Sequence, residues 1–312
     1  MRLQAVIDYA VYLAVRIFIC VVQALPLDAC DQIAAGLATL FTRVIRIRYR
    51  VSDENLRHAY PELSDQERRQ LIWRMWHHLF LMVAEVAHAQ RKIHRSNWHQ
   101  HVSLLREEEL SRVLLQPGSK LIVSGHFGNF EVAGYLLGLF GFPTVSVARP
   151  LDNPYLDRYL AQFRSGTGQS LLPKQGSAAE IDKLLSEGGT LAILGDQAAG
   201  SRGCWIEFFN RPASAHKAIA LFSLGNQVPM LVTYCRRLGR PLYFENGLQA
   251  LADPRDSGYK LGTVPELTQW YSDRLEEIVN LAPEQYWWLH RRWKGEPPAK
   301  KRRASERSSQ AA

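Results

Sequence analysis

The chain has 312 residues, 46% of them hydrophobic, and a formal net charge of +8 at neutral pH. This length and apolar content suit a folded protein with a substantial core and exclude a wholly disordered chain. About half of the net charge lies in residues 299–312, where Glu306 is outnumbered by basic side chains: Lys300, Lys301, Arg302, Arg303 and Arg307. We expect this basic tail to be disordered and not to bind nucleic acid, since short basic tails are usually solvated or directed to lipid.

Cysteine and histidine spacing gives no indication of a metal site. Cys20, Cys30, Cys204 and Cys235 show no CxxC pattern, so a reduced, cytosol-facing protein is the simplest interpretation. The His77-His78 pair is not accompanied by an HExxH motif. We therefore expect neither a metal nor another cofactor.

An apolar N-terminal stretch runs from Tyr9 to Leu25 and is interrupted by Arg16 and Gln23. Its 17 residues are at the short limit for crossing a bilayer. A second apolar run, 33–47, lies beside a cluster that favours anionic headgroups on the cytoplasmic side: Arg43, Arg46, Arg48 and Arg50. We expect residues 1–48 to form a membrane-associated helical segment that is embedded in the inner leaflet or just spans it. The alternative is a buried helix of a soluble domain.

The rest of the chain alternates between predicted helices and strands. Ser64 to Glu67 resembles a capping box in front of an amphipathic helix over 68–86. Apolar runs and turn residues then predict strands at 120–124, 144–148, 190–194, 229–235 and 242–245. Helices are expected at 129–140, 154–164, 177–186, 215–224 and 265–281. This alternation predicts an α/β fold with a mixed, largely parallel sheet flanked by helices, in one main domain over residues 49–298.

Three polar residues follow predicted strands. His126, Arg149 and Asp196 each come just after a strand, and ligands of α/β sheets bind at the carboxyl ends of strands. Two simpler interpretations stay open at this point. Asp196 can instead cap a turn, and Arg149 can instead pair with Asp152 on the surface.

The segment from Ser124 to Glu131 places His126 five residues before a carboxylate, between a strand and a helix. Inside one ideal helix the two side chains would diverge by about 140°. We therefore expect His126 to lie in the loop and Glu131 in the first turns of the helix, folded back onto one imidazole nitrogen. A carboxylate there would fix the tautomer of a general base whose ordinary pKa is roughly 6.5. A surface hydrogen bond is the alternative.

Several segments, in order, resemble the late acyltransferases of lipid A biosynthesis, the lauroyl and myristoyl transferases, within the wider glycerolipid acyltransferase group. His126-Phe127-Gly128-Asn129-Phe130-Glu131 is similar to the family's HFGNWE motif, with Phe130 where tryptophan is usual. The other similar segments span about residues 1 to 298: Asn55-Leu56 with Tyr60-Pro61-Glu62-Leu63, Ala148 to Pro154, Gly195-Asp196-Gln197, Phe208-Phe209, and Tyr286 to Lys294.

This resemblance implies a membrane enzyme that passes a fatty acyl chain from a thioester to a lipid hydroxyl. His126 would remove the hydroxyl proton and Glu131 would orient His126, without an acyl-enzyme. Backbone amides of Gly128 and Asn129 would stabilise the oxyanion. Arg149 and Arg164 would bind phosphates or sugar-acid carboxylates, and Asp196 with Gln197 would help to bind the acceptor.

The partners implied by the resemblance are acyl carrier protein as donor, a lipid A precursor as glycolipid acceptor, and the cytoplasmic face of a bacterial inner membrane. One alternative is the relative that uses acyl-CoA to acylate a mannosylated phosphatidylinositol. A second alternative is a non-catalytic lipid-binding protein that keeps the fold.

Overall fold

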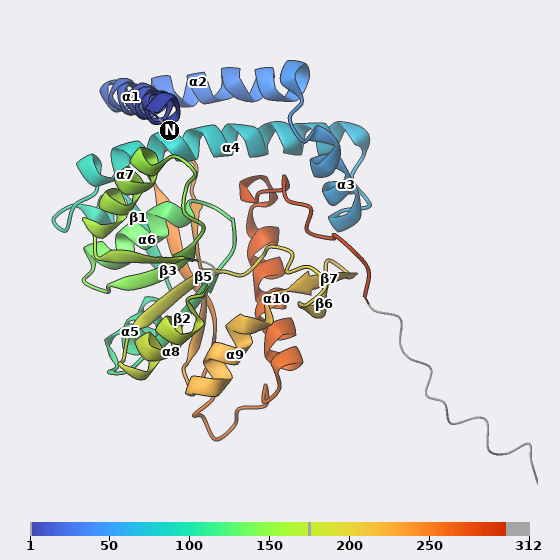
Figure 1. Ribbon diagram of the computed structural model, residues 1–312. Coiled ribbons are helices and arrows are strands. Elements are labelled where there is room, and N and C mark those ends of the chain that lie inside the picture. The colour runs from blue at the N-terminus through green and yellow to red at the C-terminus, as the bar shows by residue number, and fades with distance from the viewer. Residues whose placement is uncertain (1, 174–175, 298–312) are drawn as a thin grey trace, which may run out of the picture.

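The computed structural model describes residues 2–173 and 176–297, which fold around a seven-stranded sheet (Figure 1). The strand order is β1-β9-β8-β2-β5-β3-β4. Strands β8 and β9 pair antiparallel, whereas the β1–β9, β8–β2, β2–β5, β5–β3 and β3–β4 pairs are parallel. The predicted mixed, largely parallel α/β fold is confirmed. The basic tail, 299–312, lies outside the described residues.

The strands of the sheet are β1 (Val102–Leu105), β2 (Lys120–Ser124), β3 (Thr144–Ala148), β4 (Gln169–Pro173), β5 (Thr190–Leu194), β8 (Met230–Arg237) and β9 (Phe244–Ala252), and β6 (Cys204–Phe208) pairs with β7 (Arg211–Ala215) in a separate antiparallel hairpin. The helices are α1 (Arg2–Ala24), α2 (Leu27–Leu40), α3 (Tyr49–Ala59), α4 (Asp65–Lys92), α5 (Glu107–Leu115), α6 (Phe130–Leu139), α7 (Pro154–Ser165), α8 (Ala178–Ser186), α9 (Lys217–Asn226) and α10 (Val264–Leu281). Shorter helical turns lie at Phe41–Ile45, Trp98–Gln100 and Pro283–Gln285.

Both faces of the sheet are covered, which explains why the middle of the central strand β2, residues 121–123, is apolar. Successive side chains of a strand point to opposite faces. Leu121 and Val123 pack in the core formed with α8, α9 and α10, and Ile122 packs with α5 on the other face. Because water is excluded from both sides, the loop that follows β2 starts from a rigid base.

Helix α4 begins where the sequence predicts. Ser64 Oγ accepts a hydrogen bond from Glu67 N at 3.3 Å, and Ser64 N donates to Glu67 Oε2 at 2.7 Å. This capping box satisfies two backbone donors at the start of the helix. At the other end of α4, Ala89 and the C-cap residue Ile93 pack on α6 in a second core cluster.

Helices α1 and α2 lie beyond α4, on the side away from the sheet (Figure 1). The chain turns at Pro26, and the buried side of α2 packs on α4 through Cys30 and Ala34. Among the described residues, one helical segment, Leu3–Ala24, is long and apolar enough to cross a membrane. Few of its side chains are buried in the protein.

Sequence patterns do not predict every strand. Strands β1 and β4 are the two edges of the sheet, and each is only four or five residues long. An edge strand has one neighbour and part of its surface in water, so its sequence carries a weak apolar signal. The β6–β7 hairpin also lies outside the predicted strands, because its burial depends on α10, which is distant in sequence.

Candidate active site

The loop between β2 and α6 carries the candidate catalytic histidine. Strand β2 ends at Ser124 and α6 begins at Phe130, so His126 lies at the carboxyl end of a central strand. Asn129 is the N-cap of α6, and its Oδ1 accepts a hydrogen bond from Val132 N at 3.1 Å. The predicted placement of His126 in the loop and Glu131 in the first helical turn is therefore confirmed.

Asp196 is the carboxylate that binds the His126 imidazole. Its Oδ1 lies 2.7 Å from His126 Nδ1, and its Oδ2 accepts the backbone N–H of His126 at 2.9 Å. Asp196 follows β5, which pairs in parallel with β2, so the two strand ends meet at one edge of the sheet. The buried carboxylate therefore holds the imidazole as the tautomer with the proton on Nδ1 and a lone pair on Nε2.

The expectation that Glu131 contacts an imidazole nitrogen is wrong. Glu131 instead pairs with Arg164 in the last turn of α7, where Nε donates to Oε2 at 3.2 Å and Nη2 donates to Oε1. The physical reason is that Nδ1 is already occupied by Asp196, which the β2–β5 pairing brings closer. The Arg164 guanidinium, which the resemblance implies as a ligand of a substrate anion, is therefore bound to a carboxylate of the protein itself.

Opposing influences set the pKa of His126. Burial lowers it, but the charge of Asp196 and its hydrogen bond raise it, with a further upward contribution from Glu131, and the net pKa lies above its ordinary value. For Asp196, burial raises the pKa, but the His126 imidazole and backbone hold it well below the usual range. Asp196 is therefore ionised and can stabilise the positive charge of a protonated His126.

Gln197 and His290 lie beside Nε2 of the His126 imidazole. Gln197 Nε2 is 3.3 Å from Nε2 of His126 and 3.3 Å from Nε2 of His290. Burial, followed by the nearby His126, lowers the pKa of His290. This places a neutral second imidazole and an amide beside the atom of His126 that can accept a proton.

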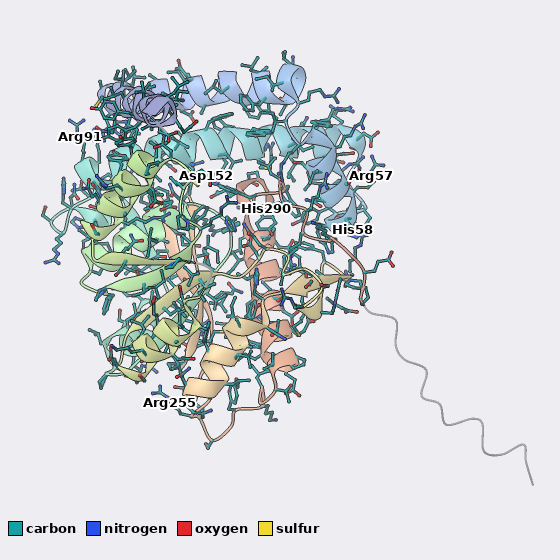
Figure 2. All side chains as sticks on the ribbon, viewed as in Figure 1. Arg57, His58, Arg91, Asp152, Arg255 and His290 are labelled. Atoms are coloured by element: carbon teal, nitrogen blue, oxygen red, sulfur yellow. The ribbon has the colours of Figure 1, made fainter. Side chains whose placement is uncertain are left out.

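Aromatic side chains enclose the same region. The ring centroids of Phe130, Trp287 and His290 lie 5.3, 5.2 and 4.9 Å from that of His126. His290, which is partly exposed, is labelled in Figure 2, beneath α4. The sequence does not place Trp287 and His290 at the site, although they lie in an aromatic-rich segment with a histidine, which is the signal it offers.

Gly128 and Asn129 support the loop and do not present free amides. Gly128 N donates to Gln285 O at 2.9 Å, and Asn129 N donates to Cys235 O at 2.7 Å. Asn129 is fully buried, and its Nδ2 donates to Glu85 Oε2 at 3.0 Å. The expectation that these two amides bind the oxyanion is therefore wrong, because both are already bonded to carbonyl groups.

Gly128 is required by the backbone itself. Its φ of +58° lies in the left-handed region, and a Cβ there would come within 2.0 Å of Cys235 O. We predict that Gly128→Ala lowers the free energy of unfolding by about 3 kcal/mol, from left-handed strain plus the collision. The matched control is Gly141→Ala, at φ +88° with nothing within 4 Å, which should cost only about 1 kcal/mol. Urea unfolding monitored by circular dichroism would measure both; equal losses would contradict the collision.

Arg149 is not brought to the His126 site. It comes just after β3, as predicted, but its side chain is 80% exposed and its Nη2 pairs with Asp152 Oδ1 at 3.0 Å. The expectation that it faces His126 and Asp196 is wrong, because the loop after β3 directs it into solvent. An ion pair this exposed contributes little to stability. Of the predicted residues, the structure thus brings Asp196 and Gln197 to His126, and pairs Glu131 with Arg164.

The fold and site define an α/β enzyme in which a histidine–aspartate pair lies at the carboxyl edge of a mostly parallel sheet. The family model described as bacterial lipid A biosynthesis acyltransferase matches residues 2–295, and the chain belongs to this family. The chain is thus an O-acyltransferase of lipid A synthesis.

Curated relatives match along most of their length. The lipid A biosynthesis lauroyltransferase of Escherichia coli (strain K12) is 26% identical over 291 residues, covering 92% of this chain and 92% of that protein. The lipid A biosynthesis palmitoleoyltransferase of the same organism is 23% identical over 293 residues, covering 88% and 87%. Among solved structures, the 1-acyl-sn-glycerophosphate (LPA) acyltransferase PlsC from Thermotoga maritima has a TM-score of 0.39 and 13% identity, covering 80% of this chain and 97% of that chain.

Proposed function

We propose that this protein transfers a fatty acyl chain from acyl carrier protein to a hydroxyl of a lipid A precursor, at the cytoplasmic face of the inner membrane. The observation that carries the proposal is the contact of 2.7 Å between His126 Nδ1 and buried Asp196, which leaves Nε2 as the ring nitrogen that Asp196 does not bind. A base held in this way can activate a hydroxyl near neutral pH.

The reaction needs no covalent enzyme intermediate. Nε2 of His126 removes the hydroxyl proton as the hydroxyl oxygen attacks the thioester carbonyl carbon. This attack forms the carbon–oxygen bond of the ester. Collapse of the tetrahedral intermediate re-forms the carbonyl and breaks the carbon–sulfur bond, and the imidazolium returns its proton to the leaving thiolate. Asp196 stabilises the imidazolium between these two steps and keeps Nε2 in place. Glu131 supports the site through Arg164 and through its charge.

Gln197 is the candidate donor to the developing oxyanion. The backbone amides of Gly128 and Asn129 already donate hydrogen bonds within the protein. The Gln197 side-chain amide, in contrast, lies 3.3 Å from His126 Nε2, the nitrogen that accepts the hydroxyl proton in this proposal. A substrate hydroxyl that binds His126 Nε2 displaces this amide, which can then turn to the adjacent carbonyl oxygen. Such donors act where negative charge develops in the transition state.

We predict that Gln197→Ala lowers kcat by roughly 10² to 10³, the usual effect of losing one oxyanion donor, and changes KM for the acyl donor far less. Steady-state kinetics with a labelled acyl donor would measure both constants. Gln66→Ala is the control, since Gln66 is an exposed amide in the first turn of α4. An unchanged kcat in the Gln197 variant would rule out the donor role.

The function itself is tested by offering the purified protein each acyl donor with each acceptor. Acyl carrier protein thioesters and acyl-CoA are each combined with a lipid A precursor and with a mannosylated phosphatidylinositol, and products are identified by mass spectrometry. The expected result is a lipid A precursor that gains one acyl chain from acyl carrier protein. Transfer confined to acyl-CoA and the phosphatidylinositol acceptor would overturn the proposal, as would binding of either lipid without transfer.

A further inference from the structure

The N-terminal helix α1 has a polar side, and this side lies against the folded domain. Asn153 Nδ2 donates to the backbone oxygen of Asp8 at 2.8 Å, and Gln23 Nε2 donates to Ala87 O at 2.8 Å. The guanidinium of Arg16 lies 4.6 Å from the ring centroid of Tyr159 on α7. The charged and amide groups that interrupt the apolar sequence of α1 are therefore used in contacts with the rest of the protein.

These contacts extend along most of the helix. From residue 8 to residue 23, a rise of 1.5 Å per residue gives about 22 Å of helix held against α7 and the end of α4. A membrane-spanning helix must pass through about 30 Å of hydrocarbon. If α1 crossed the bilayer with these contacts intact, α7 would enter it too, together with exposed Asp152 and Arg158. Charged groups within the hydrocarbon are costly. Helix α1 therefore cannot cross the bilayer while it keeps its contacts with α7 and α4.

The opposite side of α1 is apolar and exposed. Its large side chains have relative exposures between 42% and 75%: Leu3, Val6, Ile7, Val11, Leu13, Ile17, Phe18 and Val21. A helix with one apolar side and one side bonded to protein resembles helices that lie in the membrane interface, with the apolar side buried at the level of the headgroups.

A second apolar and basic surface lies on α2 and the turn that follows it. Its apolar members are 40% to 72% exposed: Ile33, Leu40, Val44, Ile45 and Ile47. Arg43, Arg46 and Arg50 are also exposed, and the sequence has no acidic residue from position 32 to position 52. Apolar side chains interspersed with unopposed arginines complement an anionic lipid surface. Like α1, helix α2 lies beyond α4 on the side away from the sheet, and the turn after α2 leads down to α3 (Figure 1).

We infer that α1 lies in the plane of the membrane surface and does not cross it, and that residues 33–50 form a second contact with the same anionic leaflet. The inference rests on the proposed function in assuming a membrane-borne acceptor. It deepens that proposal, because α7 links α1 to the site: Tyr159 contacts Arg16, and Arg164, in the last turn of the same helix, pairs with Glu131. The membrane contact thus adjoins the element that supports the catalytic loop.

The side of the membrane on which the N-terminus lies distinguishes an in-plane α1 from an α1 that crosses the bilayer. A protease-cleavable tag is placed before Met1 in a Cys20→Ser background, and a Glu187→Cys reporter is placed on the exposed end of α8. Spheroplasts and inverted membrane vesicles of expressing cells are then treated with protease or with a membrane-impermeant maleimide. We expect tag cleavage and Glu187→Cys labelling in the same preparation. Cleavage in the opposite preparation would show that α1 crosses the bilayer and would overturn the inference.

The second contact is tested by binding to vesicles. The full chain is mixed with vesicles of phosphatidylethanolamine and phosphatidylglycerol, or of phosphatidylcholine alone. The triple variant Arg43→Gln, Arg46→Gln, Arg50→Gln should bind the anionic vesicles about a hundredfold more weakly than wild type, at about 1 kcal/mol per arginine, and bind the neutral ones equally. The control carries the same charge change elsewhere, at Arg112→Gln, Lys183→Gln and Lys260→Gln, all exposed.

An equal loss in both triple variants would overturn the second contact, since net charge alone would then account for binding. A stable dimer that binds no vesicles would overturn the inference as a whole, because a second copy would then cover the apolar surfaces. Neither measurement requires acyl transfer. If no acyl transfer is found with any donor and acceptor, but the tag and the reporter lie on the same side of the membrane, the proposed function is refuted and the in-plane arrangement of α1 is still supported.

Discussion

Replacing His126 with glutamine should reduce acyl transfer by about 10⁴-fold, the upper range for loss of a general base. Glutamine keeps a polar side chain of similar reach but has no group that accepts a proton near neutral pH. The fold should persist, because the loop is held by backbone bonds from Gly128 to Gln285 and from Asn129 to Cys235. Single-turnover assays with labelled acyl carrier protein thioester would measure the rate, and circular dichroism would confirm folding.

His99→Gln is the matched control for this experiment, since His99 is exposed and lies in a helical turn before β1. It should retain wild-type turnover. A folded His126→Gln variant with turnover within tenfold of wild type would remove His126 from the role of base.

The carboxylate that orients His126 can be identified by comparing two conservative variants. Asp196→Asn should lower kcat by roughly 10³ to 10⁴, because an amide no longer stabilises the imidazolium and favours the wrong tautomer. Glu131→Gln should have a much smaller effect, since Glu131 bonds to Arg164 rather than to the imidazole. Steady-state kinetics of both purified variants would decide between the two carboxylates. A larger loss in Glu131→Gln than in Asp196→Asn would restore Glu131 as the orienting partner.

The pH profile gives a second readout of the same comparison. The neutral imidazole is the active form, so in the wild type kcat/KM should fall as the pH drops through the raised pKa of His126, with a midpoint above 6.5. Asp196→Asn removes the negative charge that raises this pKa and weakens the hydrogen bond to the imidazolium, whereas burial, which lowers the pKa, remains. The acid limb of that variant should therefore move to lower pH. An unmoved limb would show that Asp196 does not set the pKa of His126.

The sequence predicts the parts of the site that depend on local pattern. The apolar run before Ser124 and the glycines around His126 indicate strand, loop and helix, and the expected strands at 144–148 and 190–194 match β3 and β5. The positions of His126 and Asp196 at strand ends follow from the same patterns. The order of the strands in the sheet does not follow from them, because strand pairing depends on tertiary packing. The short spacing in the sequence and the resemblance both favour Glu131 over Asp196 as the partner of His126.

The remaining site residues depend on contacts across the chain. His290 lies 164 positions after His126, and local periodicity carries no information on a pairing of that range. The occupied amides of Gly128 and Asn129 likewise depend on Gln285 and Cys235, which no spacing rule connects to the loop. Arg149 shows the opposite case, since its neighbour Asp152 in the sequence is also its partner in space.

The segment around Gln285 has a consequence for how the protein matures. Trp287 N donates to His126 O at 3.0 Å, and Gln285 O accepts from Gly128 N. Residues near the end of the described chain therefore hold in place a loop that is synthesised much earlier. A growing chain that stops before residue 285 can already contain α1, the strands β1 to β9 and Cys235, the partner of Asn129, but it lacks the backbone partners of His126 and Gly128. In the proposed mechanism, the histidine loop is therefore complete only after residues 285–287 have been made, long after the α1 segment that we infer to bind the membrane.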